Sequence, residues 1–343
     1  MKALFIGGTG TISAAISRNV LAKGWELYLL NRGNRNNLFS GKVTEILGDI
    51  NNEADVAEKI RGLQFDVVAD FITFGPAQIE RDFRLFKDKT KQYIALSSAS
   101  AYQKPLSNYR ISESTPLANP FWEYSRNKIA CEELLLSLYR NYGFPITIVR
   151  PSHTYDERSV PLGVHGKYGS WQVVKRIREG KPVIIHGDGT SLWTLTHNRD
   201  FAQGFTGLMG NSHAIGEAVQ ITSDETLTWN QIYETIARTL EVPLKAVHIA
   251  SDFLAQSGTY NFRGGLLGDK AHSMVFDTAK LKRLVPGFSP QVRFDQGIRE
   301  TLAYVLAHKE QQKDDPEFDA WCDKVIAVQD QAVKDILEAK PSE

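Results

Sequence analysis

Residues 4–24 have the sequence "LFIGGTGTISAAISRNVLAKG", and this stretch decides the fold of the chain. An apolar run ends in glycines at positions 7, 8 and 10, and Ile12, Ile16 and Val20 then recur at helical spacing. A strand that turns tightly into a helix next to a pyrophosphate needs residues without a Cβ atom, and the first N–H groups of that helix attract phosphate. Ser13 is small enough to take the place of a third glycine. The pattern therefore favours a dinucleotide site over a purely structural turn.

The first 150 residues alternate short apolar runs with stretches of helical spacing. The runs are "KALFI", "WELYLL", "KVTEIL", "FDVVADFI", "QYIAL" and "PITIVR". This alternation is typical of a doubly wound parallel sheet, whose strands are apolar throughout because helices cover both faces. We therefore expect an α/β fold with a Rossmann-like dinucleotide-binding domain over residues 1–155, to which a segment near 195–222 returns.

The pattern changes after Pro151. Residues 150–169 are rich in Pro, Gly and polar side chains and predict a loop. Beyond them we expect a strand at 182–187, and helices at 170–180, 228–242, 277–285 and over the last 30 residues. We assign residues 156–194 and 223–343 to a smaller mixed α/β domain that binds the substrate.

The composition excludes several classes of protein. Lys+Arg and Asp+Glu both number 40 in the 343 residues, so the chain lacks the basic footprint of a nucleic-acid binder. The two cysteines, Cys131 and Cys322, lie far apart in helical segments, which favours a reducing, cytoplasmic setting. No apolar run approaches the roughly 20 residues that span a bilayer, so we expect no membrane association. The eight histidines show no metal-ligand spacing, so we expect no metal.

The second apolar run ends at "LLNRGNRNN", residues 29–37. An acidic residue here would bond the ribose 2′-OH of NAD, but the position holds Asn31, and Arg32 and Arg35 follow. Because arginines can pair with a 2′-phosphate, NADP is slightly preferred over NAD. Asp49, in "LGDI", has two readings that stay open: it accepts a hydrogen bond from the adenine amino group, or it caps a helix starting near Asn51.

At this point the chain resembles the extended short-chain dehydrogenase/reductase family, the NAD-dependent epimerase/dehydratase group. The matching segments run in the family's order from residue 3 to about 202: "GGTGTIS", "LGDI", "ALSSASAYQKP", "ISESTPLANPFWEYSRNKIACEE", "RPSHTYD" and "GDGTSLWTLTHNRDFA", with a weaker match in "FDTAKLKRLVPGF". Together with the glycine pattern, the resemblance gives the expected contacts to NAD(P): Gly7, Thr9, Gly10, Thr11, Ile12, Asn31, Arg32, Arg35, Asp49, Ile50 and Lys128.

The resemblance also implies a catalytic triad of Ser98, Tyr124 and Lys128. A tyrosine and a lysine four residues apart carry little weight alone, because such residues share a helix face for structural reasons. The chemistry is nevertheless intelligible. A phenol has a pKa of about 10, and a nearby ammonium stabilises the phenolate and brings that pKa towards neutral. Tyr124 would be the acid/base, Lys128 would also hold the nicotinamide ribose, and Ser98 would bond the substrate oxygen.

The residues after Ser98 bear on the reaction. Nucleotide-sugar dehydratases of the family carry an Asp-Glu pair directly after the Ser/Thr, where this chain has Ala99 and Ser100. Because neither is a general acid or base, dehydration by that route is not expected. Epimerisation and net oxidation–reduction both remain open. Ser100 and Tyr102 are expected to border the substrate.

The substrate side departs from the family at two further positions. His153 stands where many relatives have an asparagine, and Trp193 replaces the arginine that binds the diphosphate of nucleotide sugars. We expect both to contact a sugar or sugar-like substrate that reacts at a secondary alcohol, with Trp193 stacking on a sugar ring or another planar or apolar group. The alternatives are a His153 bonded to loop backbone and a Trp193 that only packs.

Two other readings stay open. The run "TLTHNRDFA", residues 194–202, also resembles chloroplast stem-loop RNA-binding relatives, so a non-catalytic nucleotide- or RNA-binding protein on the same fold is the alternative function. Neutral charge and the intact triad argue against it, and we expect a small-molecule partner and no nucleic acid. The leucine-rich "IACEELLLSLY", residues 129–139, fits a homodimer through this helix, or burial within the monomer.

Overall fold

The computed structural model describes residues 1–33, 36–39, 41–258 and 260–338. Its contacts divide the chain into two units, each built from several segments. The first comprises Met1–Tyr155, Thr194–Glu225 and Val275–Arg293, and the second comprises Asp156–Trp193, Thr226–Met274 and Phe294–Glu343.

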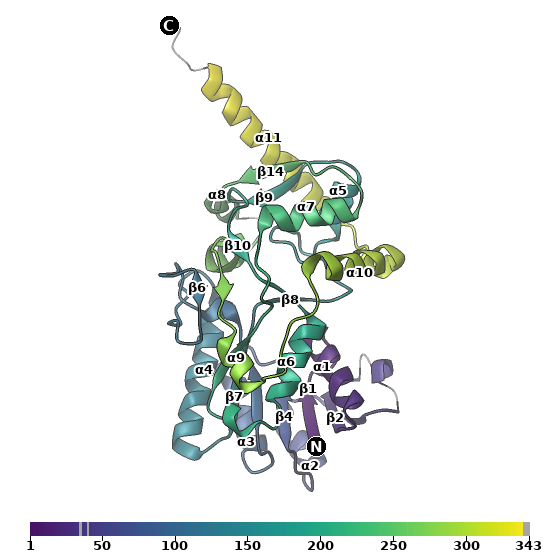
Figure 1. The fold of residues 1–343 in the computed structure, drawn as a ribbon, viewed down its shortest axis with the longest axis vertical. Helices are drawn as coiled ribbons and strands as arrows, with labels where there is room; N and C mark the ends of the chain where they lie inside the picture. Colours follow the sequence, from purple (N-terminus) through teal and green to yellow (C-terminus); the bar gives the residue numbers. More distant parts are fainter. Residues whose placement is uncertain (34–35, 40, 259, 339–343) are drawn as a thin grey trace. The chain divides into compact units, whose positions relative to one another are not determined.

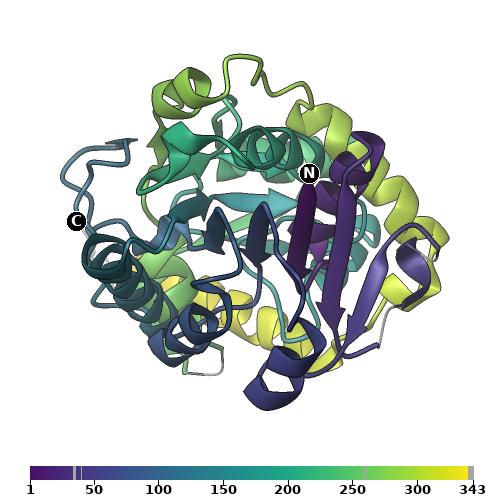
Figure 2. The ribbon, with the colours of Figure 1, turned by 90° about the horizontal axis from the view of Figure 1, so that it is seen from below.

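The first unit is built on a parallel sheet of seven strands in the order β12-β7-β5-β4-β1-β2-β3. Figure 2 shows strands of this sheet as arrows, the N-terminal ones in purple. The strands are β1 (Lys2–Ile6), β2 (Glu26–Asn31), β3 (Thr44–Leu47), β4 (Val67–Asp70), β5 (Tyr93–Leu96), β7 (Ile146–Pro151) and β12 (Ala218–Ile221). This confirms the predicted doubly wound α/β fold. The strand order reverses between β1 and β4, which is where such sheets bind ligands.

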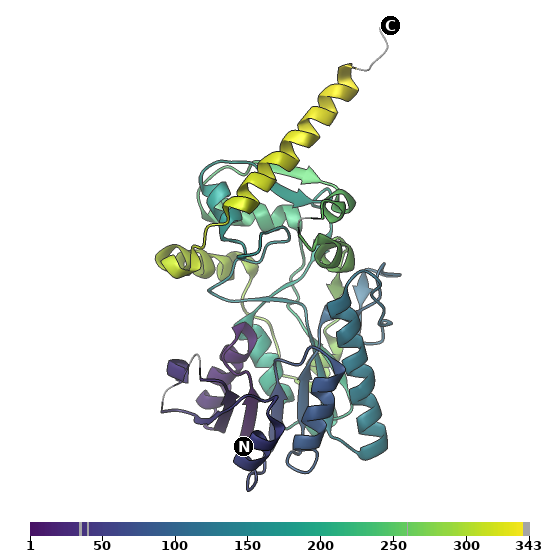
Figure 3. The ribbon, with the colours of Figure 1, turned by 180° about the vertical axis from the view of Figure 1, so that it is seen from behind.

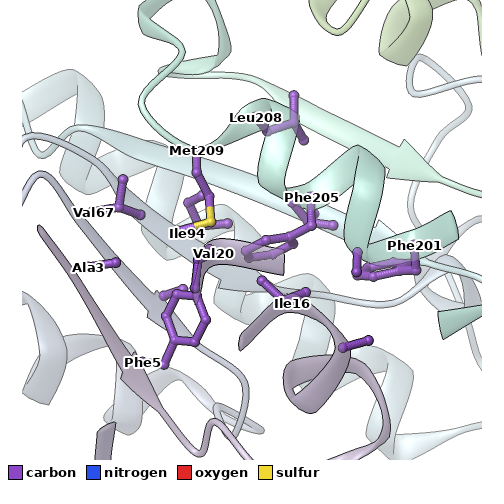
Figure 4. Close-up of a cluster of buried hydrophobic side chains, with 14 of the residues drawn as sticks. Ala3, Phe5, Ile16, Val20, Val67, Ile94, Phe201, Phe205, Leu208 and Met209 are labelled. Atoms are coloured by element: carbon purple, nitrogen blue, oxygen red, sulfur yellow. The ribbon is translucent and has the colours of Figure 1, made fainter. Parts of the chain in front are cut away.

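Helices cover both faces of the sheet, which explains the uninterrupted apolar strands. One face carries α1 (Thr11–Ala22), α6 (Asn198–Leu208) and α9 (Ala279–Leu284). Figure 4 shows Phe5 of β1 and Ile16 of α1 packed with Phe201 and Phe205 of α6. Burying a side chain of this kind contributes about 1.5–3 kcal/mol.

The opposite face carries α2 (Glu53–Lys59), α3 (Pro76–Phe86) and α4 (Glu123–Tyr142). Leu135 and Leu138 of α4 are buried in the core on this side, and Leu134 and Leu136 pack against it. Burial within the unit therefore accounts for these leucines of α4.

Short elements complete the first unit. They are the parallel pairs β6 (Arg110–Ile111) with β15 (Val275–Phe276) and β8 (His153–Tyr155) with β11 (Leu195–His197), and the 3-10 turns η1 (Asn36–Phe39), η2 (Ala99–Ala101) and η3 (Ser212–Ala214). Residues 275–293 therefore belong to the first unit, whereas the sequence assigned them to the second domain. The reason is the pairing of β15 with β6, together with the burial of Leu281 and Phe288 in the core next to α6.

The second unit is a mixed α/β assembly (Figure 1). Its helices are α5 (Trp171–Arg178), α7 (Trp229–Thr239), α8 (Ser251–Gln256), η4 (Arg263–Lys270), α10 (Phe294–Ala307), η5 (Lys309–Gln311) and α11 (Pro316–Glu338). Its strands are β9 (Val183–His186) paired with β14 (Ala246–Ile249), and β10 (Leu192–Trp193) paired with β13 (Leu227–Thr228). The last turns of α11 extend beyond the other elements of this unit (Figure 3). In the described part of the chain, no helix combines the length and the apolar character that crossing a membrane requires.

Candidate functional site

The turn between β1 and α1 brings backbone close to neighbouring side chains. Gly7 has a φ of +82°, and a Cβ atom there would lie 2.6 Å from Cγ2 of Ile72. At Gly8 the added Cβ would lie 2.5 Å from Cδ2 of Leu29. Both distances are shorter than carbon atoms tolerate, so the turn requires glycine for its conformation and for its packing.

Two serines of α1 hold this turn in place. Ser13 Oγ donates to the carbonyl of Gly7 at 2.8 Å and accepts from the amide of Gly10 at 2.9 Å. One turn later, Ser17 Oγ donates to the carbonyl of Gly8 at 3.0 Å. Ser13 is therefore more than a small substitute for a glycine, since its hydroxyl closes the loop. Its neighbour Gly10, the N-cap of α1, places no side chain over the first amides of the helix.

A cavity of about 500 Å³ opens at the carboxyl ends of β1 to β4, at the point where the strand order reverses. It is lined by Ile6, Gly7, Thr9, Leu30, Asn31, Arg32, Gly48, Asp49, Ile50, Asn51, Ile72, Phe74 and Gln78. Six of the expected cofactor contacts, Gly7, Thr9, Asn31, Arg32, Asp49 and Ile50, are therefore brought together.

Other expected contacts lie elsewhere, and some wall residues were missed. Among the described residues, Gly10, Thr11 and Ile12 are not on the wall; they form the start of α1. Arg35 lies outside the described residues. The missed wall residues include Ile72, Phe74 and Gln78, which follow β4, and the signal for them was the end of the apolar run "FDVVADFI" at the reversal point. The others are Ile6, Leu30, Gly48 and Asn51.

The end of β2 offers the cavity no carboxylate. Asn31 Oδ1 accepts from the amide of Gly33 at 2.8 Å, and Arg32 is an exposed residue on the cavity wall.

The segment after β3 is ordered by Asp49. Its Oδ1 accepts from both the backbone amide of Asn51, at 2.9 Å, and the side-chain amide of Asn51, at 3.0 Å. Helix α2 begins only at Glu53, and its N-cap is Asn52, whose side chain accepts from the amide of Asp55. The alternative in which Asp49 caps this helix is therefore wrong, and its carboxylate instead shapes the cavity wall.

Lys128 points from α4 into the end of the sheet. Its Nζ donates to the carbonyls of Thr73, at 2.5 Å, and Leu96, at 2.7 Å, and the side chain is buried. Burial lowers the pKa of this ammonium below its usual value. The same nitrogen lies 5.0 Å from the ring centre of Phe74, which lines the cavity, and 5.7 Å from that of Tyr124.

Tyr124 lies one helical turn before Lys128 and is half-buried. Its ring centre is 5.0 Å from that of Trp122 and 6.5 Å from that of Phe74. The spacing of four residues thus places the phenol and the ammonium on one face of α4, beside the cavity.

Ser98 follows β5 and is connected to α4 through hydroxyl groups. Ser98 Oγ and Ser100 Oγ are 2.9 Å apart, and Ser125 Oγ donates to Ser100 Oγ at 2.8 Å. Ser125 is the residue after Tyr124. Two hydrogen bonds therefore tie Ser98 to the helix that carries the tyrosine and the lysine.

A buried ion pair fixes α4 against the same strands. Arg150 of β7 donates to the carboxylate of Glu132 of α4 through Nε at 3.0 Å and Nη2 at 2.6 Å. Ser97, the residue before Ser98, also donates to Glu132. The carboxylate therefore holds the end of β5, β7 and α4 in one arrangement.

Tyr102 is not available to a substrate, contrary to the sequence-based expectation. Its side chain is fully buried, and its hydroxyl donates to Gln220 Oε1 at 2.8 Å and accepts from Arg150 Nη1 at 3.2 Å. Ser100, also expected at the substrate, is buried as well and bonds the hydroxyls of Ser98 and Ser125.

The two remaining substrate candidates lie in different units. His153 is a half-buried residue of β8 in the first unit. Trp193 belongs to the second unit and is only 3% exposed. Its ring packs 5.5 Å from Trp229, with Lys270 Nζ 5.9 Å from its centre. Trp193 is thus a packing residue, and the expected stacking surface for a sugar is not there. Among the described residues, no three His, Cys, Asp or Glu side chains gather as metal ligands.

Similarity to known proteins extends over most of the chain. The model of the NAD dependent epimerase/dehydratase family matches residues 3–222. An uncharacterized UDP-glucose epimerase of Bacillus subtilis (strain 168) is 26% identical over 62% of this chain, which spans 60% of that relative's length. The 2′-dehydrokanamycin reductase of Streptomyces kanamyceticus is 22% identical over 84% of this chain and 80% of its own. The fold matches that of UDP-glucuronic acid 4-epimerase from Bacillus cereus, in complex with UDP-glucuronic acid and NAD, with a TM-score of 0.72 at 20% identity over 90% and 99% of the two chains.

Proposed function

The chain belongs to the NAD dependent epimerase/dehydratase family, and we propose that it transfers hydride between NAD(P) and a secondary alcohol of a sugar or sugar-like substrate. The observation that carries this proposal is the position of Lys128. A buried ammonium lies 5.7 Å from the ring centre of Tyr124, and beside it Phe74 lines the cavity. Burying a charge is costly, and the carbonyls of Thr73 and Leu96 hold this one in place next to the phenol.

The cavity supports a dinucleotide in particular. The glycine turn at its edge leaves no room for side chains, so backbone can approach a pyrophosphate there. Gly7, Thr9, Asn31, Arg32, Asp49 and Ile50 would hold the group. When bound, a nicotinamide dinucleotide supplies the hydride acceptor or donor.

The proton is moved by this chain's own residues. The positive charge of Lys128 lies beside the Tyr124 ring, and a nearby opposite charge stabilises a phenolate. Tyr124 can therefore take the proton of a substrate hydroxyl and return it. Ser98 orients the reacting oxygen, while Ser100 and Ser125 hold Ser98 through the hydroxyl chain.

NADP is the preferred cofactor in this proposal. The support is the missing carboxylate after β2 and the arginine, Arg32, on the cavity wall. Guanidinium groups pair well with a phosphate. Substituting Arg32→Ala should weaken binding of NADPH more than binding of NADH, measured by fluorescence titration. An equal effect on both would remove the preference.

Two observations bear on which reaction of the family this chain catalyses. Ala99 and Ser100 offer no acid or base where family dehydratases carry an Asp-Glu pair, so elimination of water is disfavoured. The names of the two relatives support epimerisation and net reduction respectively. The identity of dinucleotide released on denaturation separates these. Near-stoichiometric NAD would indicate a recycled cofactor and an epimerase, whereas an empty protein that binds NADPH reversibly would indicate a reductase.

The central test is Tyr124→Phe, with Tyr142→Phe as the matched control. Tyr142 lies on the same helix, but its side chain is exposed. Turnover is followed by NAD(P)H absorbance on a panel of nucleotide sugars and keto sugars. Losing general acid–base catalysis should lower turnover by about 10²–10⁴-fold while cofactor affinity is unchanged. If Tyr124→Phe retains full activity, or if wild-type protein binds neither NAD nor NADP, the proposed function fails.

A further inference from the structure

Arg81 of α3 is a buried arginine that the proposed mechanism does not use. Arg81 is 4% exposed, and each nitrogen of its guanidinium lies near a polar partner. Nη1 donates to Asn51 Oδ1 at 2.8 Å. Nε and Nη2 lie 2.8 and 2.7 Å from Asp82 Oδ1, and Nη2 also lies 3.4 Å from Asp70 Oδ2. Burying a cation is costly unless its hydrogen bonds are well placed, so the burial of this guanidinium needs an explanation.

Two of these partners lead to the wall of the cofactor cavity. Asn51 is itself a wall residue, and its amide groups bond Asp49, another wall residue. On the other arm, the second oxygen of Asp70 accepts from the amide of Ile72 at 2.6 Å, and Ile72 is also on the wall. One guanidinium thus connects the wall segment after β3 with the wall segment after β4.

The cluster around Arg81 is buried. Tyr93, fully buried, donates to the second oxygen of Asp82 at 2.6 Å. Burial, together with the charge of Asp70, raises the pKa of Asp82 well above its usual range.

We propose that Arg81 is a positioning residue for the dinucleotide: its fork fixes the segments that carry Asn51 and Ile72, and cofactor affinity depends on it. The inference rests on the proposed function in so far as the cavity binds a dinucleotide. A lysine at this position would keep the charge but could not bond three partners in a plane.

The chain offers a matched control in Arg84, three residues further along α3. Arg84 makes a bidentate contact with Glu53, at 2.9 and 2.6 Å, so its guanidinium is also bound to a carboxylate. The pair is exposed to solvent, and neither residue lines the cavity. Arg81→Lys and Arg84→Lys therefore make the same chemical change. The first alters the residue that links the two wall segments, and the second alters a residue outside this link.

The experiment measures the Kd of NAD and of NADP by calorimetry for the wild type, Arg81→Lys and Arg84→Lys. Loss of one charge-assisted bond in the fork should weaken binding by about tenfold or more in Arg81→Lys. Arg84→Lys should bind as the wild type does. In the protein without cofactor, hydrogen exchange of the Asn51 and Ile72 amides should accelerate in Arg81→Lys alone.

A second substitution, Asn51→Ala, tests whether Arg81 acts through Asn51, and it changes an exposed residue. It should weaken binding in the wild type and in Arg84→Lys, but add little in Arg81→Lys, because both changes break the same contact. An arginine that only stabilised the fold would not produce this coupling.

The outcomes distinguish a failure of the proposed function from a failure of the inference about Arg81. A wild type that binds neither dinucleotide overturns the proposed function and the inference with it. A wild type that binds, together with an Arg81→Lys of unchanged affinity, overturns the inference alone. Should Arg81→Lys fail to fold, Asn51→Ala decides, and unchanged affinity in that variant also overturns the inference.

Discussion

The buried pair of Glu132 and Arg150 offers a stability test with an internal reference. The exposed pair of Glu53 and Arg84 has the same geometry. Nη2 to carboxylate oxygen is 2.6 Å in both, and Nε to oxygen is 3.0 Å in the buried pair and 2.9 Å in the exposed one. The two pairs differ in environment, because the buried side chains are 2% and 6% exposed and the surface ones 39% and 55%. Comparing Glu132→Gln with Glu53→Gln therefore isolates the effect of burial.

The expected magnitudes are far apart. Glu132→Gln removes the negative charge, leaves the guanidinium of Arg150 uncompensated in the interior, and should cost about 3–5 kcal/mol of unfolding free energy. Ser97 also loses its charged acceptor. Glu53→Gln should leave stability nearly unchanged, because water screens an exposed pair. Replacing both buried charges, in Glu132→Leu with Arg150→Met, should be milder than the single change.

Urea denaturation followed by circular dichroism gives the free energies. All four side chains lie in the first unit, so stepwise unfolding of the two units would affect both comparisons alike. A Glu132→Gln whose transition midpoint coincides with that of Glu53→Gln would refute the reasoning. A double variant less stable than Glu132→Gln would show that the penalty comes from lost packing instead.

Three further predictions follow from single residues. Gly7→Ala should lose dinucleotide affinity and lower the melting temperature, because its φ is +82° and the new Cβ would press on Ile72 at 2.6 Å; calorimetry showing wild-type affinity would contradict this. Burial lowers the pKa of His186 to about 4, so the stability it gives is present above its usual pKa of about 6.5 and is lost as the pH falls towards 4. Between pH 7.5 and 5 the wild type should lose about 2 kcal/mol that His186→Gln does not lose, and equal losses in urea titrations would contradict this. Burial raises the pKa of the Cys131 thiol to about 11, so iodoacetamide at pH 7.5 should leave it unmodified in the folded protein but not in urea, as mass spectrometry would show.

The sequence predicted those features that depend on neighbours along the chain. The glycine turn and six strands of the sheet were recognised because their patterns are local and strongly apolar. The seventh strand, β12, was missed because Gln220 interrupts its apolar run. That glutamine is buried and satisfied by distant partners, donating to the carbonyls of Ile111 and Asp277 and accepting from Tyr102. Polar residues with such partners cannot be told from surface residues in a sequence.

For the same reason, only part of the candidate site could be predicted from the sequence. Glycine positions and the spacing of Tyr124 and Lys128 are visible in the sequence. The burial of Tyr102 and Trp193, which removes them from the substrate, depends on contacts with Gln220 and Trp229 that no local pattern reveals.

The serine chain described above joins three hydroxyl groups, with Ser100 at its centre. Ser125 donates to Ser100, and Ser100 Oγ lies 2.9 Å from Ser98 Oγ. The backbone amide of Ser100 also donates to Ser98 Oγ at 3.2 Å. Ser98 is therefore held by both the side chain and the backbone of Ser100. Ser125→Ala would cut the link to α4 while leaving both contacts of Ser98 in place.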